Sequence, residues 1–198
     1  MNFFKKLFST TKIKENVQQP NSFSETRLSD IATEEYFNNR YKKDAIDVSI
    51  LDGALKMIES YFIENKLEKK IKEPINHPQN LDQTIDDGFG FVLFCKAYNM
   101  EEKHALMFLS LAFNDFMIKN YGFKLYKDSE PEFPLRTMTL KYDNKGAKLS
   151  LYPIEYTTKV LNYESSFEDL HIRIQNSLEN IPTSDDVYNK LMSSLDDK

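Results

Sequence analysis

Two pairs of residues have the types and the spacing to bind a metal ion. Glu101 and His104 are three residues apart, and Glu168 and His171 repeat that spacing. Residues three apart on a helix share a face, so each pair would present a carboxylate and an imidazole together. Two such pairs plus two further glutamates form the dinuclear carboxylate centre of four-helix bundles.

The rest of such a centre would have to come from other glutamates of the chain. Glu59 with Glu64, or Glu34 with Glu35, are the available pairs. Three predicted strands interrupt the helices, however, and glutamate is abundant enough to precede a histidine by chance. We therefore expect His104 and His171 to be surface residues and predict no metal or cofactor, with the dinuclear site as the alternative.

Cys95 and His77 are the other residues with catalytic potential. Cys95 follows the apolar residues 91–94, a setting that raises the pKa of a thiol and is typical of a buried structural cysteine. His77 lies in a predicted loop with no nucleophile recognisable beside it, so we expect it at the surface. The chain has no Gly-x-Ser-x-Gly, His-Glu-x-x-His or phosphate-binding loop. A non-catalytic protein is favoured, and an enzyme with dispersed site residues is an alternative.

Charge and composition narrow the class of protein further. The chain has 198 residues, a formal net charge of −5, one cysteine and no tryptophan, with a core of Phe, Leu and Ile expected. A negative surface repels phosphate backbones, which argues against nucleic acid as a partner. No apolar run approaches the roughly 18–20 residues that cross a bilayer. These features predict a soluble cytoplasmic protein with no intramolecular disulfide.

The first residues form a short amphipathic pattern. Phe3, Phe4, Leu7 and Phe8 share one helical face, with lysines on the other. The apolar stretch is too interrupted for a secretory signal. A weak membrane-surface anchor, a short helix docked on its own domain and a frayed tail all remain open.

Periodicity defines the elements that must position these side chains. Apolar residues at helical spacing predict helices over 30–41, 47–67, 86–98 and 101–121, with a loop at 69–83. Alternation then predicts strands at 123–126, 135–142 and 148–152, the last two joined as a hairpin through 143–146. Helices are expected again at 154–161, where Pro153 suits the first turn, and from 167 to about 178.

This order of elements predicts an α+β fold. N-terminal helices precede a three-stranded antiparallel meander, and C-terminal helices then pack on the sheet. Residues 1–29 are expected to be a flexible segment, 30–181 a single α+β domain, and 182–198 an acidic tail.

Residues 109–181 resemble a bacterial domain of unknown function (family number 3806). The matching stretches are Leu109–Tyr126, a helix that ends at Gly122 and leads into a strand, and Leu149–Lys159, a strand that meets a proline opening a helix. The resemblance implies a fold but no known activity, catalytic residue or cofactor.

One set of residues favours a protein-binding function. Tyrosines, lysines and threonines of the predicted strand region are common at protein interfaces, although cross-strand pairing in an ordinary sheet favours the same types. The set is Tyr126, Thr137, Thr139, Lys141, Tyr142, Tyr152 and Tyr156. We expect a non-catalytic interaction domain with a protein partner of unknown identity. An immunity-type protein that neutralises a basic toxin is one version, and a membrane-surface adaptor is a further alternative.

Overall fold

The computed structural model describes residues 38–144, 147–182 and 184–196. The chain divides into two units, Met1–Thr33 and Glu34–Lys198, and all described residues belong to the second. The amphipathic segment with Phe3, Phe4, Leu7 and Phe8, and most of the helix predicted over 30–41, therefore lie outside the described residues. No helix among the described residues has both the length and the apolarity that a membrane span requires.

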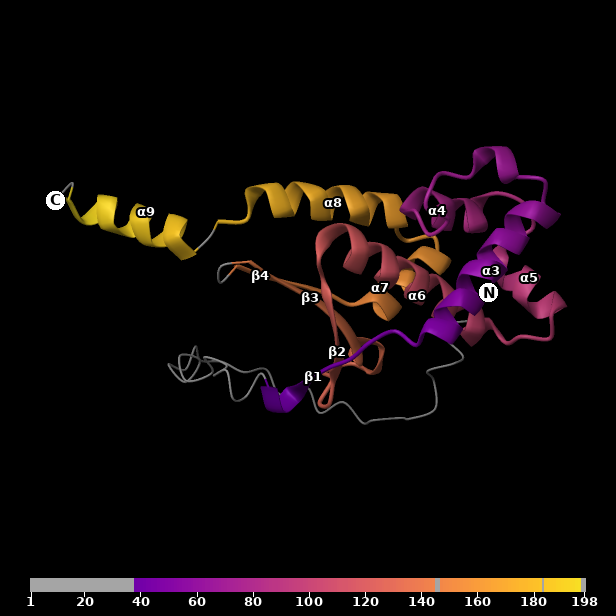
Figure 1. Cartoon of the computed structure of the whole chain (residues 1–198), viewed down its shortest axis with the longest axis horizontal. Helices are drawn as coiled ribbons and strands as arrows, with labels where there is room; N and C mark the ends of the chain where they lie inside the picture. The colour runs from indigo at the N-terminus through magenta and orange to yellow at the C-terminus, as the bar shows by residue number, and fades with distance from the viewer. Residues whose placement is uncertain (1–37, 145–146, 183, 197–198) are drawn as a thin grey trace, which may run out of the picture. The chain divides into compact units, whose positions relative to one another are not determined.

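A four-stranded antiparallel sheet organises the described part of the chain. Its strands are β1 (Tyr41–Lys43), β2 (Lys124–Asp128), β3 (Met138–Asn144) and β4 (Ala147–Leu151), in the order β1-β2-β3-β4 (Figure 1). The predicted α+β class and the β2–β4 meander are confirmed. The prediction missed β1, because three residues are too few to show a strand alternation.

The two faces of the sheet differ in chemistry. Cross-strand partners such as Leu125–Leu140 and Leu140–Leu151 place one apolar set on the same face. This inner face contributes to the core that the helices α6 (Glu102–Tyr121) and α7 (Pro153–Leu161) complete. The residues that alternate with this apolar set along each strand point away from α6 and α7. We call that side of the sheet the outer sheet face.

The helices that precede the sheet follow the predicted pattern in part. α3 (Val48–Glu64) begins at Asp47, whose carboxylate accepts the N–H groups of Ser49 and Ile50. α6 ends at Gly122, which is left-handed at φ 72°, as a helix-terminating glycine commonly is. Both helices confirm the predictions for 47–67 and 101–121, and the predicted helix over 86–98 is the shorter α5 (Phe91–Ala97).

The prediction of a loop over residues 69–83 was wrong for about half of these residues. A short 3-10 turn, η2 (Glu68–Lys70), is followed by the helix α4 (Pro78–Asp86). Pro78 stands in the first turn of α4, where its missing N–H costs nothing, so this proline begins a helix. A second 3-10 turn, η3 (Pro134–Arg136), takes the start of the strand predicted over 135–142.

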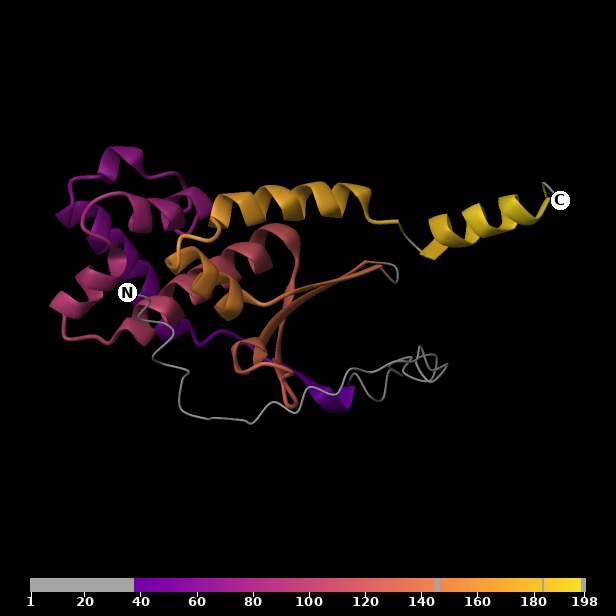
Figure 2. The same ribbon diagram turned by 180° about the vertical axis from the view of Figure 1, so that it is seen from behind.

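The last described helices are α8 (Phe167–Asn180) and α9 (Ser184–Asp196). The N-terminal end of α8 lies against α4, and the two helices meet there in both views (Figures 1 and 2). The predicted helix at 167–178 is therefore confirmed, but it packs on other helices more than on the sheet. The core is rich in phenylalanine, as predicted. Its fully buried aromatic rings among the described residues are Tyr61, Phe62, Phe91, Phe94, Phe113, Phe123 and Phe167.

Candidate functional site

The outer sheet face gathers lysines and tyrosines from strands that are distant in sequence. Register places Tyr41 and Lys43 of β1 opposite Asp128 and Tyr126 of β2, and Lys124 opposite Lys141 of β3. Lys43 and Lys124 are exposed, whereas the tyrosines and Lys141 are partly buried. Asp143 of β3 is exposed on the same side as Lys141. The lysines outnumber it, so the face is basic on balance, although the whole chain carries a net charge of −5.

Several of these side chains are held in place by neighbours on the same face. The Lys141 ammonium lies 3.9 Å from the centroid of the Tyr41 ring and donates a hydrogen bond to Ser150 Oγ at 3.0 Å. Arg40 donates two hydrogen bonds of 2.9 Å to the Asp128 carboxylate, one to each oxygen. An ordered surface loses less side-chain entropy on binding than a mobile one.

The structure divides the seven predicted interaction residues among three places. Tyr126, Thr139 and Lys141 share the outer sheet face, with Thr137 at its end, and Thr139 is fully buried there. Tyr142 points to the opposite face, where its ring lies 5.5 Å from that of Phe123. Tyr152 and Tyr156 lie beyond β4, at the start of α7.

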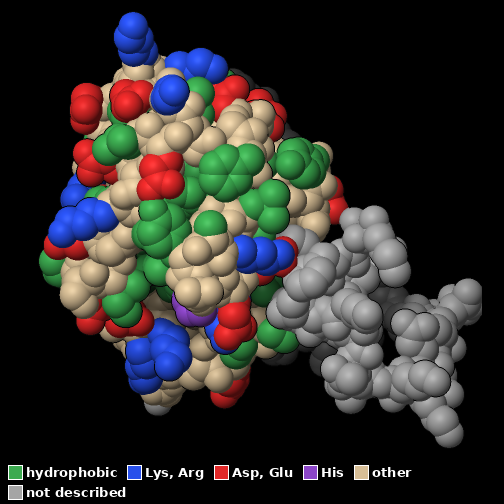
Figure 3. All heavy atoms as spheres, turned by 90° about the vertical axis from the view of Figure 1, so that its right-hand side faces the viewer, with side chains coloured by type: hydrophobic (Ala, Val, Ile, Leu, Met, Phe, Trp, Pro, Cys, Tyr) green, Lys and Arg blue, Asp and Glu red, His purple; other side chains and the backbone are tan. Residues whose placement is uncertain are grey.

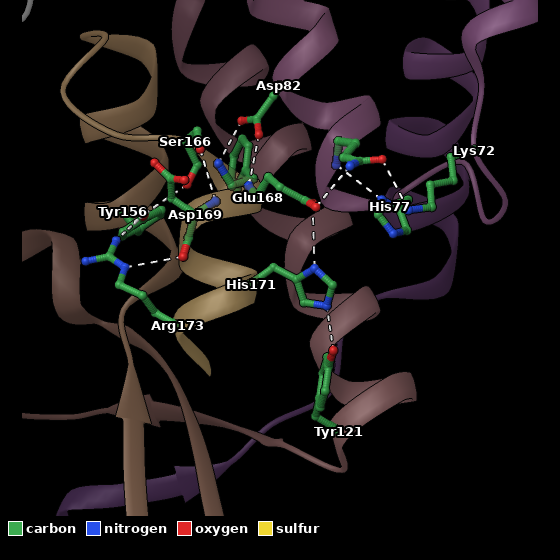
Figure 4. A network of polar contacts seen from close by, with 12 residues as sticks. Lys72, His77, Asp82, Tyr121, Tyr156, Ser166, Glu168, Asp169, His171 and Arg173 are labelled. Atoms are coloured by element: carbon green, nitrogen blue, oxygen red, sulfur yellow. Dashed lines mark hydrogen bonds and ion pairs between the residues drawn. The ribbon is translucent and has the colours of Figure 1, made fainter. Parts of the chain in front are cut away.

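A second cluster of polar residues lies at the junction of α4, α6 and α8 (Figure 4). His77 and His171 are each only 8% exposed, which contradicts their prediction as surface residues. Their rings meet edge to face at 5.8 Å, and both rest on the ring of Phe116. Sequence alone gave no reason to bring the two histidines together.

His171 stands in the middle of a chain of polar contacts. Its Nε2 is hydrogen bonded to the Tyr121 hydroxyl at 2.5 Å, and its Nδ1 lies 3.7 Å from Glu168 Oε2 (Figure 4). The other Glu168 oxygen accepts a hydrogen bond from the Gln79 side chain at 3.0 Å. A carboxylate facing Nδ1 favours the tautomer with the proton on that nitrogen, so the Tyr121 hydroxyl then donates to Nε2.

Two further residues of this junction accept hydrogen bonds from backbone N–H groups at the start of a helix. His77 Nδ1 accepts the backbone N–H of Gln79 and so caps α4. Asp82 accepts the N–H groups of Phe167 and Glu168 at 2.7 and 2.9 Å, one on each carboxylate oxygen, and so ties the start of α8 to α4. Burial raises the pKa of Asp82 to about 6, against the lowering effect of these two hydrogen bonds.

These contacts run from a hydroxyl to an imidazole to a carboxylate. A catalytic triad has the same order, in which the nucleophile contacts its base and the base contacts an orienting carboxylate. Here, however, both imidazoles pack on Phe116 and two of the three links tie one helix to another. Burial lowers the pKa of His77 and of His171, so both rings are neutral near pH 7. The arrangement is best described as a set of structural polar contacts that hold α8 against α4 and α6, and we call this set the polar lock.

No known protein family, curated protein or solved structure matches this chain. The resemblance of residues 109–181 to a domain of unknown function thus stays a prediction.

The two Glu-x-x-His pairs do not meet. Glu101 and His104 open α6, where His104 Nδ1 accepts the Glu101 backbone N–H at 3.0 Å. His171 contacts Tyr121 at the other end of the same helix, about 25 Å away at 1.5 Å per residue. The described residues contain no group of three or more His, Cys, Asp or Glu that could hold a metal ion.

The remaining residues of the predicted metal site are also accounted for. The Tyr98 hydroxyl donates a hydrogen bond to Glu64, and Glu59 is exposed on α3. Glu34 and Glu35 lie outside the described residues. Cys95 is fully buried, as predicted, and burial raises the pKa of its thiol to about 11.

The lowered pKa values of the two histidines predict that the fold loses stability in acid. A histidine whose pKa is lower when folded contributes stability above about pH 6.5, and this is lost as pH falls because the unfolded chain binds more protons. Lys72 also lowers both pKa values, whereas Glu168 raises them. Asp82 acts in the opposite direction below about pH 6, since its pKa is raised.

A comparison with one variant isolates the histidine contribution. Asparagine at position 77 can accept the same N-cap hydrogen bond but does not titrate. Between pH 7.5 and 5.5, urea unfolding should show a smaller loss of stability in His77→Asn than in the wild type, because both proteins keep Asp82. Equal losses in the two proteins would contradict the prediction.

Proposed function

We propose that this protein is a non-catalytic domain that binds another protein through the outer sheet face. The observation that carries the proposal is the gathering of Lys43, Lys124 and Lys141 with Tyr41 and Tyr126 on the side of the sheet away from α6 and α7. Tyrosine buries a large area at a small cost in side-chain entropy, and lysine provides charge complementarity.

The charge of this face decides the chemistry of the partner. Net charge alone favoured a basic partner, but the face itself carries exposed lysines, and its Asp128 is already bound by Arg40. The surface that docks on it should therefore be acidic. An immunity-type role remains one version of the proposal, with a toxin that presents an acidic surface.

Nucleic acid is a weaker candidate for the same face. Single-stranded nucleic acids are bound by aromatic rings on which bases stack. The Lys141 ammonium already lies over the Tyr41 ring.

A rival surface exists at the helical end of the molecule (Figure 3). Hydrophobic side chains gather there among charged ones, including Ile63, Phe89, Leu93 and Tyr98, each about half exposed. Phe89 and Tyr98 both contact the buried ring of Phe94. These residues extend the core outward, and no feature of the patch specifies a partner.

The proposal is tested by reversing charge on the face. Lys43→Glu combined with Lys124→Glu should reduce the partner retained on the tagged full-length protein at least about tenfold, because like charges would then face each other. The measurement is affinity purification from native cells with quantitative mass spectrometry.

The matched control changes net charge equally on the helical side. Lys56 and Lys69 are exposed there, and Lys56→Glu with Lys69→Glu should retain the partner as the wild type does. Equal loss in both variants, or retained material that nuclease removes, would overturn the proposal.

A further inference from the structure

A hollow of about 170 Å³ lies beside β4, between that strand and the helices α7 and α8. Phe113, Leu151 and Leu170 provide apolar walls, and Tyr152, Tyr156 and Lys159 also line it. An apolar cavity of about 150 Å³ is large enough for benzene. The hollow is therefore large enough for one branched aliphatic or aromatic side chain.

The hollow and the outer sheet face lie on the two sides of β4. Leu151 lines the hollow and points to the inner face, where α6 and α7 pack. The side chain of its neighbour Ser150 lies on the outer face, where it accepts the hydrogen bond from Lys141. Among the described strands, β4 stands at the end of the sheet order and pairs only with β3.

An edge strand next to a side-chain pocket is the arrangement by which sheets bind extended peptides. We propose that an extended acidic segment of the partner pairs with the edge of β4 and places one leucine-sized apolar side chain in the hollow. This inference rests on the proposed function.

Alternation along a strand explains why one segment can satisfy both features. Successive side chains of the added strand point to opposite faces. One set would face the hollow, and the other would lie over the outer sheet face near Lys141. The carboxylate that lines the hollow, Glu155, does not oppose this segment strongly, because Arg136 and Lys159 bind it at 2.7 and 3.3 Å.

The probe is a capped peptide of alternating glutamate and valine with one central leucine. Titrated into the isotope-labelled full-length protein, it should shift the amide resonances of β4 and of the first turn of α8. Alanine in place of the central leucine should weaken binding about tenfold or more, because the buried apolar area is lost. Lysines in place of the glutamates should abolish binding.

Two protein variants on the same helix locate the side chain. Leu170→Trp fills the hollow and should weaken peptide binding about tenfold, whereas Ile172→Trp lies on an exposed side of α8 and should not change it. Leu151→Trp fills the hollow from the strand and serves if Leu170→Trp fails to fold.

The outcomes separate this inference from the proposed function. Peptide binding that needs the glutamates, but does not change when the central leucine is replaced or when Leu170→Trp or Leu151→Trp is introduced, would overturn the inference and leave the proposed function standing. If the peptide does not bind at millimolar concentration, the inference is overturned. If the variant with Lys43→Glu and Lys124→Glu retains the native partner as the wild type does, the proposed function is overturned. Shifts among residues 1–37 of the free protein on Leu170→Trp would show that the chain fills its own hollow, which also overturns the inference.

Discussion

Replacing Arg40 by alanine is expected to lower the free energy of unfolding by about 3 kcal/mol, because it leaves a buried carboxylate without its partner. The Asp128 side chain is only 2% exposed, and both of its oxygens accept hydrogen bonds from the Arg40 guanidinium. Burial raises the pKa of Asp128, but the hydrogen bonds from Arg40 and from the Glu130 N–H together lower it by more than burial raises it. The pKa of Asp128 therefore lies below its usual value. Urea unfolding at pH 7 measures the effect.

A control variant and the pH dependence of stability test this prediction further. Lys42→Ala, two residues away and exposed, should change stability by no more than about 0.5 kcal/mol. A carboxylate with a lowered pKa stabilises the fold above about pH 4 and loses that contribution as pH falls further. The deficit of Arg40→Ala should therefore shrink in strong acid. A deficit below about 1 kcal/mol at pH 7 would show that water replaces the guanidinium.

The second large effect is expected at the start of α8. Asp82→Ala removes the acceptors of two backbone N–H groups, those of Phe167 and Glu168, at a site where burial limits access of water. Each unsatisfied buried donor costs about 1–3 kcal/mol, so the free energy of unfolding should fall by about 2–6 kcal/mol.

Hydrogen exchange shows whether this loss is local. Amides of α8 should exchange faster in Asp82→Ala, while those of α3 and α6 should change only with global stability. Asp86→Ala is the matched control, since Asp86 is exposed on the same helix. Uniform acceleration in every helix would mean that α8 unfolds only with the whole domain, and the lock would then have no local role.

The helices and strands with strong local patterns could be predicted from sequence. α6 has a broad apolar stripe and a terminal glycine, and the β3–β4 hairpin has alternating strands joined by turn residues. α4 was missed because Pro74 and Pro78 suggested a loop and only Leu81 and Ile85 mark an apolar side. β1 was missed because its partner strand lies more than 80 residues away.

The candidate site was predictable only as residue types. Tyr126, Thr139 and Lys141 were expected to lie together and do so, because alternation within β2 and β3 fixes their side of the sheet. The basic character of that face depends on Lys43 of β1, which no local pattern assigns to the sheet. The contacts of His171 with Tyr121 and of Asp82 with Phe167 join different helices, so nothing in the local sequence indicates them.

The pairing of β1 with β2 also bears on the order in which the chain folds during synthesis. Tyr41 leaves the ribosome more than 80 residues before its partner Asp128, an interval of about 4 to 17 s at usual elongation rates. Helices α3 to α6 can associate in that time through contacts close in sequence, whereas β1 waits for its neighbour. The sheet is therefore completed only after α3 to α6 have formed, and a nascent chain presents the lysine and tyrosine face only after β3 has emerged.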